Sequence, residues 1–158
     1  MKDFTLNRGP IWFLRGTIIL MGVPALFLFF YGFPRALYNI SGTPYAYDGL
    51  LYFVFAGFYV SIVAYAHALY HAFRLVNVIQ ERGLFSFEST PFLKALIKDA
   101  LIIAGIFLLL AVPLYIIAEL DDAPGVLLLG MIVGYGSLTV AAFAHMLKRQ
   151  IETFNDSQ

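Results

Sequence analysis

Residues 49–73 read GLLYFVFAGFYVSIVAYAHALYHAF, an unbroken stretch without Asp, Glu, Lys or Arg. The hydrocarbon core of a bilayer is crossed by about 20 consecutive apolar residues in a helix, so this stretch is long enough to span it. Three further stretches meet the same requirement, at residues 16–34, 100–118 and 123–147. The sequence therefore predicts an all-α fold with four transmembrane helices.

The composition supports a membrane protein. The chain is 61% hydrophobic and 13% charged, with a mean hydropathy of +0.81, whereas soluble domains are roughly half apolar and about a quarter charged. Little chain remains outside the apolar stretches. We therefore expect one four-span domain over residues 1–158, with spans at about 11–34, 49–74, 98–118 and 124–148. The absence of cysteine excludes disulfides and thiolate metal sites.

The distribution of basic residues predicts the topology. Nine of the ten lysines and arginines lie before the uncharged stretch at 16–34, between those at 49–73 and 100–118, or after the one at 123–147, and Arg35 is the exception. Cytoplasmic segments of membrane proteins are enriched in Lys and Arg. We therefore predict an antiparallel up-down-up-down bundle in the bacterial cytoplasmic (inner) membrane, with both termini cytoplasmic. The basic residues border the membrane, so we expect lipid as a partner and no direct binding to nucleic acid.

All three histidines lie at the predicted inner ends of spans. His67 and His71 are four residues apart in span two, and His145 is in span four. An ionisable side chain at membrane depth is costly unless it faces protein or water. Arg74 continues the stripe of His67, and Asp99 opens span three at the same depth. We therefore predict an inner-end polar cluster of His67, His71, Arg74, Asp99 and His145.

Helical periodicity places the histidines on faces made of small residues. Membrane helices pack through such residues, because close backbone approach maximises contact. The small faces should therefore pack against other helices, and the opposite faces should meet lipid. The predicted packing residues are Gly57, Ala64, Ala68, Gly130, Gly134, Ser137 and Ala141, and the predicted lipid-facing residues are Phe55, Phe58, Ile62, Leu69, Phe73, Leu129, Val133, Val140, Phe143 and Leu147.

Several interpretations of the histidines remain open. They can form a hydrogen-bonded structural cluster without a cofactor, or a site that responds to pH or a ligand. Alternatively, His67, His71 and His145 could bind a divalent metal, or His145 and one span-two histidine could be the axial ligands of a haem. A metalloprotease helix has Glu directly after its first histidine, where this chain has Ala68. No phosphate loop or nucleophile elbow is visible, so we predict that the protein is not an enzyme.

Three stretches resemble the DUF2975 family of four-span bacterial membrane proteins. They are AFRLVNVIQERGLFS at residues 72–86, LKALIKDA at residues 93–100 and PLYIIAELDDAPG at residues 113–125. The resemblance extends over most of the chain, more loosely in span one, and implies the same four-span fold. Members are often encoded beside small helix-turn-helix regulators, which implies a partner in regulation. The resemblance implies no activity and no set of functional residues, and the acidic tail of other members is missing or diverged here.

The sequence as a whole predicts a non-enzymatic inner-membrane protein with a sensory or regulatory accessory role. Its expected contact surface for a cytoplasmic regulatory protein is formed by residues 80–98 and the end of the last helix. One alternative is a small redox protein that binds haem or a metal. Another is a subunit of an oligomeric small transporter, and a homo-oligomer is compatible with each interpretation.

Overall fold

The computed structural model describes residues 8–41, 48–83 and 86–156, and within these ranges the chain is almost entirely helical. Four helices are long and apolar enough to cross a membrane, which confirms the predicted all-α class. The elements in chain order are α1 (Arg8–Phe27), a π-helical turn (Leu28–Gly32), α2 (Phe33–Ser41), α3 (Asp48–Arg82), a 3₁₀ turn (Phe87–Ser89), α4 (Thr90–Leu120) and α5 (Pro124–Asp156).

The first span is one long helical segment that is interrupted by a wider turn. Pro24 lies inside α1 and cannot donate a backbone hydrogen bond to the preceding turn. The π-helical turn begins four residues later and ends where the Phe33 N–H donates to the Leu28 carbonyl. Wider turns of this kind accommodate local disruption of a helix. Helical structure then continues through α2 to Ser41, past the predicted end of the span at residue 34.

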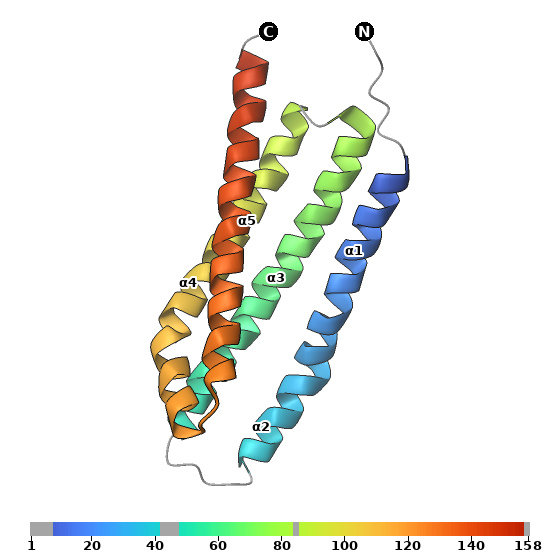
Figure 1. Ribbon diagram of the computed structural model, residues 1–158. Helices are drawn as coiled ribbons and strands as arrows, with labels where there is room; N and C mark the ends of the chain where they lie inside the picture. Colours follow the sequence, from blue (N-terminus) through green and yellow to red (C-terminus); the bar gives the residue numbers. More distant parts are fainter. Residues whose placement is uncertain (1–7, 42–47, 84–85, 157–158) are drawn as a thin grey trace.

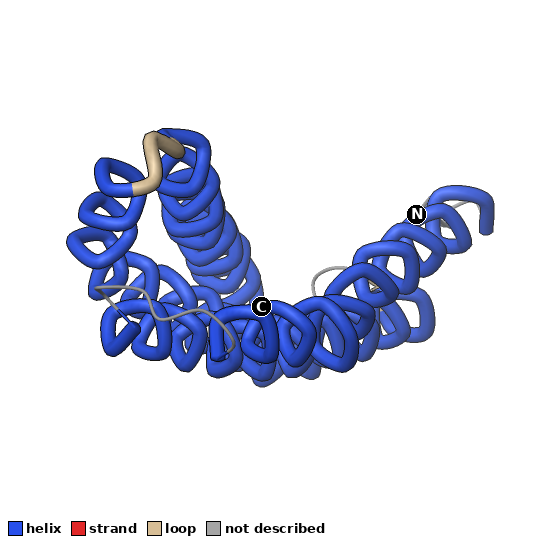
Figure 2. Tube along the Cα trace, turned by 90° about the horizontal axis from the view of Figure 1, so that it is seen from below, coloured by secondary structure: helices blue, strands red, loops and turns tan. Residues whose placement is uncertain are grey.

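The four long helices form an open row (Figure 1). The chief contacts run from α1 to α3, from α3 to α4 and from α4 to α5. Seen along the helices, α1 and α5 form the two ends of a curved row that does not close into a ring (Figure 2). The start of α1 and the end of α5 lie at the same end of the helices (Figure 1), as expected for four antiparallel spans. We call this end the inner end, and its location in the cytoplasm remains a prediction.

Short connections hold consecutive helices antiparallel. At the inner end, α3 stops at Gly83, whose φ of 88° is readily adopted by glycine at the end of a helix. The Ser86 side chain accepts a hydrogen bond from the Glu88 N–H at 3.3 Å, and Pro91 lies in the first turn of α4. At the other end, Asp122 adopts a φ of 51° in the tight turn between α4 and α5. These turns position α4 directly between α3 and α5.

Small residues bring α3 and α5 close to α4. A Cβ added to Gly57 would lie 2.7 Å from Leu110, and one added to Gly130 would lie 2.6 Å from Leu114. The resulting contacts enclose two clusters of buried apolar side chains. The main core is formed by Val54, Ile103, Phe107, Leu110, Leu114 and Ile117, and the inner-end core is formed by Leu93, Ala144 and Ile151.

Some residues predicted to face lipid are instead covered by protein. The Phe58 ring packs against Phe107 with centroids 5.5 Å apart, and the Phe55 ring packs against Phe33 at 5.7 Å. Leu147 packs against the inner-end core. The lipid-facing prediction was therefore wrong at these positions. Phe55 and Phe58 are covered because α3 lies between α1 and α4 and so has neighbours on two sides, and Leu147 is covered because the inner end of α5 packs against Leu93 of α4. On α5, the predicted lipid-facing residues Leu129, Val133, Val140 and Phe143 are exposed.

Candidate functional site: a histidine–aspartate cluster between α3 and α4

The candidate site lies where the inner half of α3 packs against α4. His67 and His71 are separated by four residues, which places them one above the other on the same face of α3. Asp99 lies on α4, nine residues after that helix begins at Thr90. The antiparallel connection between α3 and α4 brings these three side chains to the same level.

Two short contacts join the three side chains in a line. The Asp99 Oδ2 lies 2.8 Å from Nδ1 of His67, and Nε2 of His67 lies 3.2 Å from Nε2 of His71. The first distance suits a hydrogen bond in which Nδ1–H of His67 donates to the carboxylate. This bond determines the tautomer of His67, because the ring nitrogen that remains unprotonated in the neutral imidazole is then Nε2.

The cluster is buried at one end and open at the other. The Asp99 side chain is 6% exposed, whereas that of His67 is 58% exposed. A buried carboxylate loses its hydration and needs a hydrogen-bond partner within the protein. His67 supplies that partner at Asp99, while most of its own side chain is exposed. The site therefore joins a buried carboxylate to an exposed imidazole.

His71 connects the cluster to the first turn of α4. Its ring lies 6.1 Å from the Phe92 ring, measured between centroids. Phe92 was missed by the sequence analysis, although it lies seven residues before Asp99 and hence on nearly the same face of α4. Nδ1 of His71 is buried and has no hydrogen-bond partner among the described residues. The described contacts that orient this ring are therefore those with His67, Tyr70 and Phe92.

Two residues predicted for the cluster lie outside this group. The Arg74 Nε donates to the hydroxyl of Tyr70 at 3.1 Å, and the guanidinium lies over the Tyr70 ring. His145 is exposed on α5, a helix that packs chiefly against α4 and not against α3. The small-residue faces of α3 and α5 both pack against α4. His67 and His71 on α3 are therefore not brought together with His145 on α5. The haem alternative, which pairs His145 with His67 or His71, stays a prediction.

The chemistry of the grouped side chains suits a metal ion. His67, His71 and Asp99 each offer one ligand atom, and these atoms all lie within 4.8 Å of one another. Two imidazole nitrogens and a carboxylate are ligand types that zinc and similar divalent ions accept. The group contains Asp99 and not His145, and the set predicted from the sequence, with His145 as the third ligand, stays a prediction.

The predicted packing residues lie on the sides of α3 and α5 that meet α4. Gly57 and Gly130 make the closest approaches, Ala64 packs against the main core, and Ala141 is buried. Gly134 is less constrained, since a Cβ there would lie 3.3 Å from Cβ of Phe107. Ala68 and Ser137 are partly buried.

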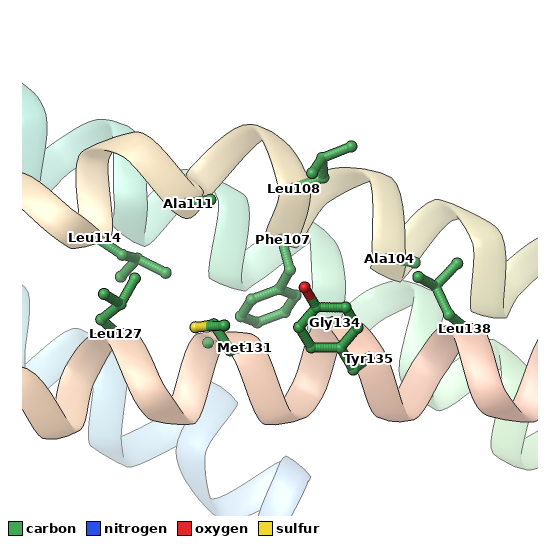
Figure 3. A pocket seen from close by; sticks show the side chains of 11 residues that line it. Ala104, Phe107, Leu108, Ala111, Leu114, Leu127, Met131, Gly134, Tyr135 and Leu138 are labelled. Atoms are coloured by element: carbon green, nitrogen blue, oxygen red, sulfur yellow. The ribbon is translucent and has the colours of Figure 1, made fainter.

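A second feature is an apolar groove of about 200 Å³ between α4 and α5. Phe107, Leu108 and Leu114 line it from α4, and Met131, Tyr135 and Leu138 line it from α5 (Figure 3). Its lining side chains are hydrocarbon apart from the Tyr135 hydroxyl and the Met131 sulfur. The groove therefore offers a packing surface, whereas the histidine cluster offers ionisable groups.

A family model described as "Protein of unknown function (DUF2975)" matches residues 36–150. The chain belongs to this family. The DUF2975 match includes His67, His71 and Asp99. The chain is also 34% identical over 150 residues to the "Uncharacterized membrane protein YoaS" of Bacillus subtilis (strain 168), a match that covers 93% of this chain and 92% of that protein. No solved structure matches.

The family and the helices together show an integral membrane protein. The similarity to a bacterial membrane protein agrees with four helices that are long and apolar enough to cross a bilayer. This DUF2975 protein is therefore a multi-pass bacterial membrane protein. The family description names no activity.

Proposed function

We propose that this protein is a non-enzymatic sensory or regulatory accessory of the bacterial cytoplasmic membrane. The observation that carries the proposal is the hydrogen bond between His67 and the buried Asp99, which crosses the interface of two membrane-spanning helices. Ionisable side chains at membrane depth are costly and commonly mark functional sites. In this proposal, the cluster of His67, His71 and Asp99 receives the signal.

The packing around His71 supports a route from the cluster to the inner end. The His71 ring contacts Phe92, whose neighbour Leu93 is 1% exposed. Leu93 packs in the inner-end core with Ala144 and Ile151 of α5. Because a close-packed core is not continuously deformable, a change at His71 should shift the first turn of α4 relative to α5.

The output surface is proposed to be residues 80–98 together with the inner end of α5. The charged side chains of residues 81–98 are exposed and carry both signs, and Arg82 forms an ion pair with Glu88 across the connection between α3 and α4. Lys94 and Lys98 are exposed on the first turns of α4. A surface of this kind suits a cytoplasmic regulatory protein that carries complementary charges.

Site-specific photo-cross-linking in native membranes tests this proposal. A photoreactive residue at Lys94 should capture a discrete protein, and the Asp99→Asn substitution should change the yield of that product. Leu108 provides a matched control position, because it lies on the same helix and is 79% exposed on an apolar surface. Equal labelling from both positions, or a Lys94 product that is indifferent to Asp99→Asn, would contradict the sensory role.

A further inference from the structure

We infer that His67 and His71 bind a divalent transition-metal ion through their Nε2 atoms, and that Asp99 orients His67 for this purpose. The inference concerns the same cluster as the proposed sensory role, and it rests on that role for its biological purpose. It names the class of ligand to which the cluster would respond. The ligand set differs from the one predicted by sequence, since it contains His67 and His71 without His145, and Asp99 serves to orient His67.

The spacing of the two ring nitrogens matches that of ligands that share one ion. Nε2 of His67 and Nε2 of His71 lie 3.2 Å apart. With zinc–nitrogen distances of about 2.0–2.1 Å, two ligands of a tetrahedral site are separated by about 3.3 Å. Each ring already turns its Nε2 toward that of the other, so the two nitrogens are at a suitable separation before an ion binds.

Asp99 is placed to hold His67 and is not itself a ligand in this arrangement. Its Oδ2 lies 2.8 Å from Nδ1 of His67, which is a hydrogen-bond distance and shorter than the separation expected for two ligands of one ion. Metal-binding histidines commonly donate their second ring N–H to a carboxylate, which fixes the tautomer and raises the basicity of the ligating nitrogen. The Asp99 charge also offsets part of the charge of the ion.

The exposure of the cluster suits an ion that exchanges. Most of the His67 side chain is exposed, so an ion can reach the ring without passing through the packed interior. Nδ1 of His71 lacks a partner among the described residues, so this ring is held less firmly than that of His67. Because the protein supplies only two ligands, and one of them is the loosely held His71 ring, we expect the ion to bind reversibly, as a sensor requires.

A hydrogen bond between the two imidazoles is the competing explanation of the 3.2 Å contact. In that case Nε2–H of His71 donates to Nε2 of His67, and the chain of three side chains is complete without an ion. The two explanations differ in what happens when metal is added. Only the metal site predicts a stoichiometric spectroscopic change that depends on both histidines.

Cobalt titration of the purified full-length protein distinguishes these explanations. The protein is prepared in detergent without a polyhistidine tag, stripped with a chelator and titrated with Co²⁺, whose visible absorption reports its coordination. We expect a single Co²⁺ per chain, displaced by Zn²⁺, with binding lost in His71→Ala. Asp99→Asn should weaken binding by about 10- to 100-fold, the usual effect of removing an outer-shell partner. His145→Ala is the matched control and should leave the titration unchanged.

Two results would overturn the metal site. The first is that the wild type binds Co²⁺ no more strongly than the His67→Ala/His71→Ala double variant. The second is that His145→Ala loses as much Co²⁺ binding as His71→Ala. Thermal unfolding of each variant shows whether it is folded, and His71→Ala provides the decisive comparison if Asp99→Asn does not fold.

The cross-linking experiment separates failure of the metal site from failure of the sensory role. Cobalt binding combined with a Lys94 product that responds to neither metal nor Asp99→Asn would retain the metal site and reject sensing. A Lys94 product that depends on Asp99, combined with no cobalt binding, would retain sensing and reject the metal.

Discussion

Replacement of Gly57 by alanine should weaken the contact between α3 and α4. The added Cβ would lie 2.7 Å from Cδ1, 3.0 Å from Cδ2 and 3.1 Å from Cγ of Leu110, well inside the separation of about 3.5–4.0 Å at which carbon atoms attract. Leu110 is 1% exposed and cannot turn its side chain into open space. Overpacking of a well-packed core costs about 1–3 kcal/mol.

Gly105→Ala is the control that isolates this clash. Alanine favours a helix over glycine by up to about 1 kcal/mol, and this gain applies at both positions because both lie inside long helices. A Cβ added to Gly105 meets nothing within 4 Å. The free energy of unfolding of Gly57→Ala should therefore be about 1–3 kcal/mol lower than that of Gly105→Ala, as measured by titration with SDS in mixed micelles.

A second substitution tests whether Leu110 is the cause. Leu110→Ala should destabilise the wild type by about 2–5 kcal/mol, since it removes a buried side chain. In the Gly57→Ala background the same change should cost less, by a coupling of about 0.5–3 kcal/mol, because it also removes the clash. Equal stabilities of the two glycine variants, together with additive effects of the pair, would refute the reasoning.

Three further predictions follow from the packing and the charges. Gly134→Leu should lower stability in detergent more than Val133→Leu, because a Cβ on Gly134 already lies 3.3 Å from Phe107 whereas Val133 is exposed; the reverse order would mean that the faces of α5 are assigned backwards. Arg15→Ala should reduce the free energy of unfolding by about 1–3 kcal/mol, since Arg15 Nη2 donates to Oδ1 of Asn77 at 2.6 Å. Combination with Asn77→Ala should be non-additive, and additive losses would count against this contact. Reporters fused at the C-terminus and between α2 and α3 should give opposite signals, and equal signals would contradict the four-span topology.

Much of the candidate site could be predicted from helical spacing alone. His67 and His71 share a face because four residues advance a helix by little more than one turn. Asp99 follows a short predicted connection, so an antiparallel pair of helices brings it to the level of the histidines. The contact between Arg74 and Tyr70 could have been predicted in the same way, because Tyr70 precedes Arg74 by four residues on the same helix.

The sequence by itself determined the local properties of this protein: four apolar spans, their antiparallel order and the faces that carry small residues. Only the tertiary structure decided which helices are neighbours. Phe58 belongs to the packed interior because α3 lies between α1 and α4, and His145 lies apart from His67 because α5 packs chiefly on α4. The physical reason is that in lipid there is little hydrophobic drive between helices. A small-residue face therefore shows that a helix packs closely, but the choice of partner depends on the complementary shapes of all the helices together.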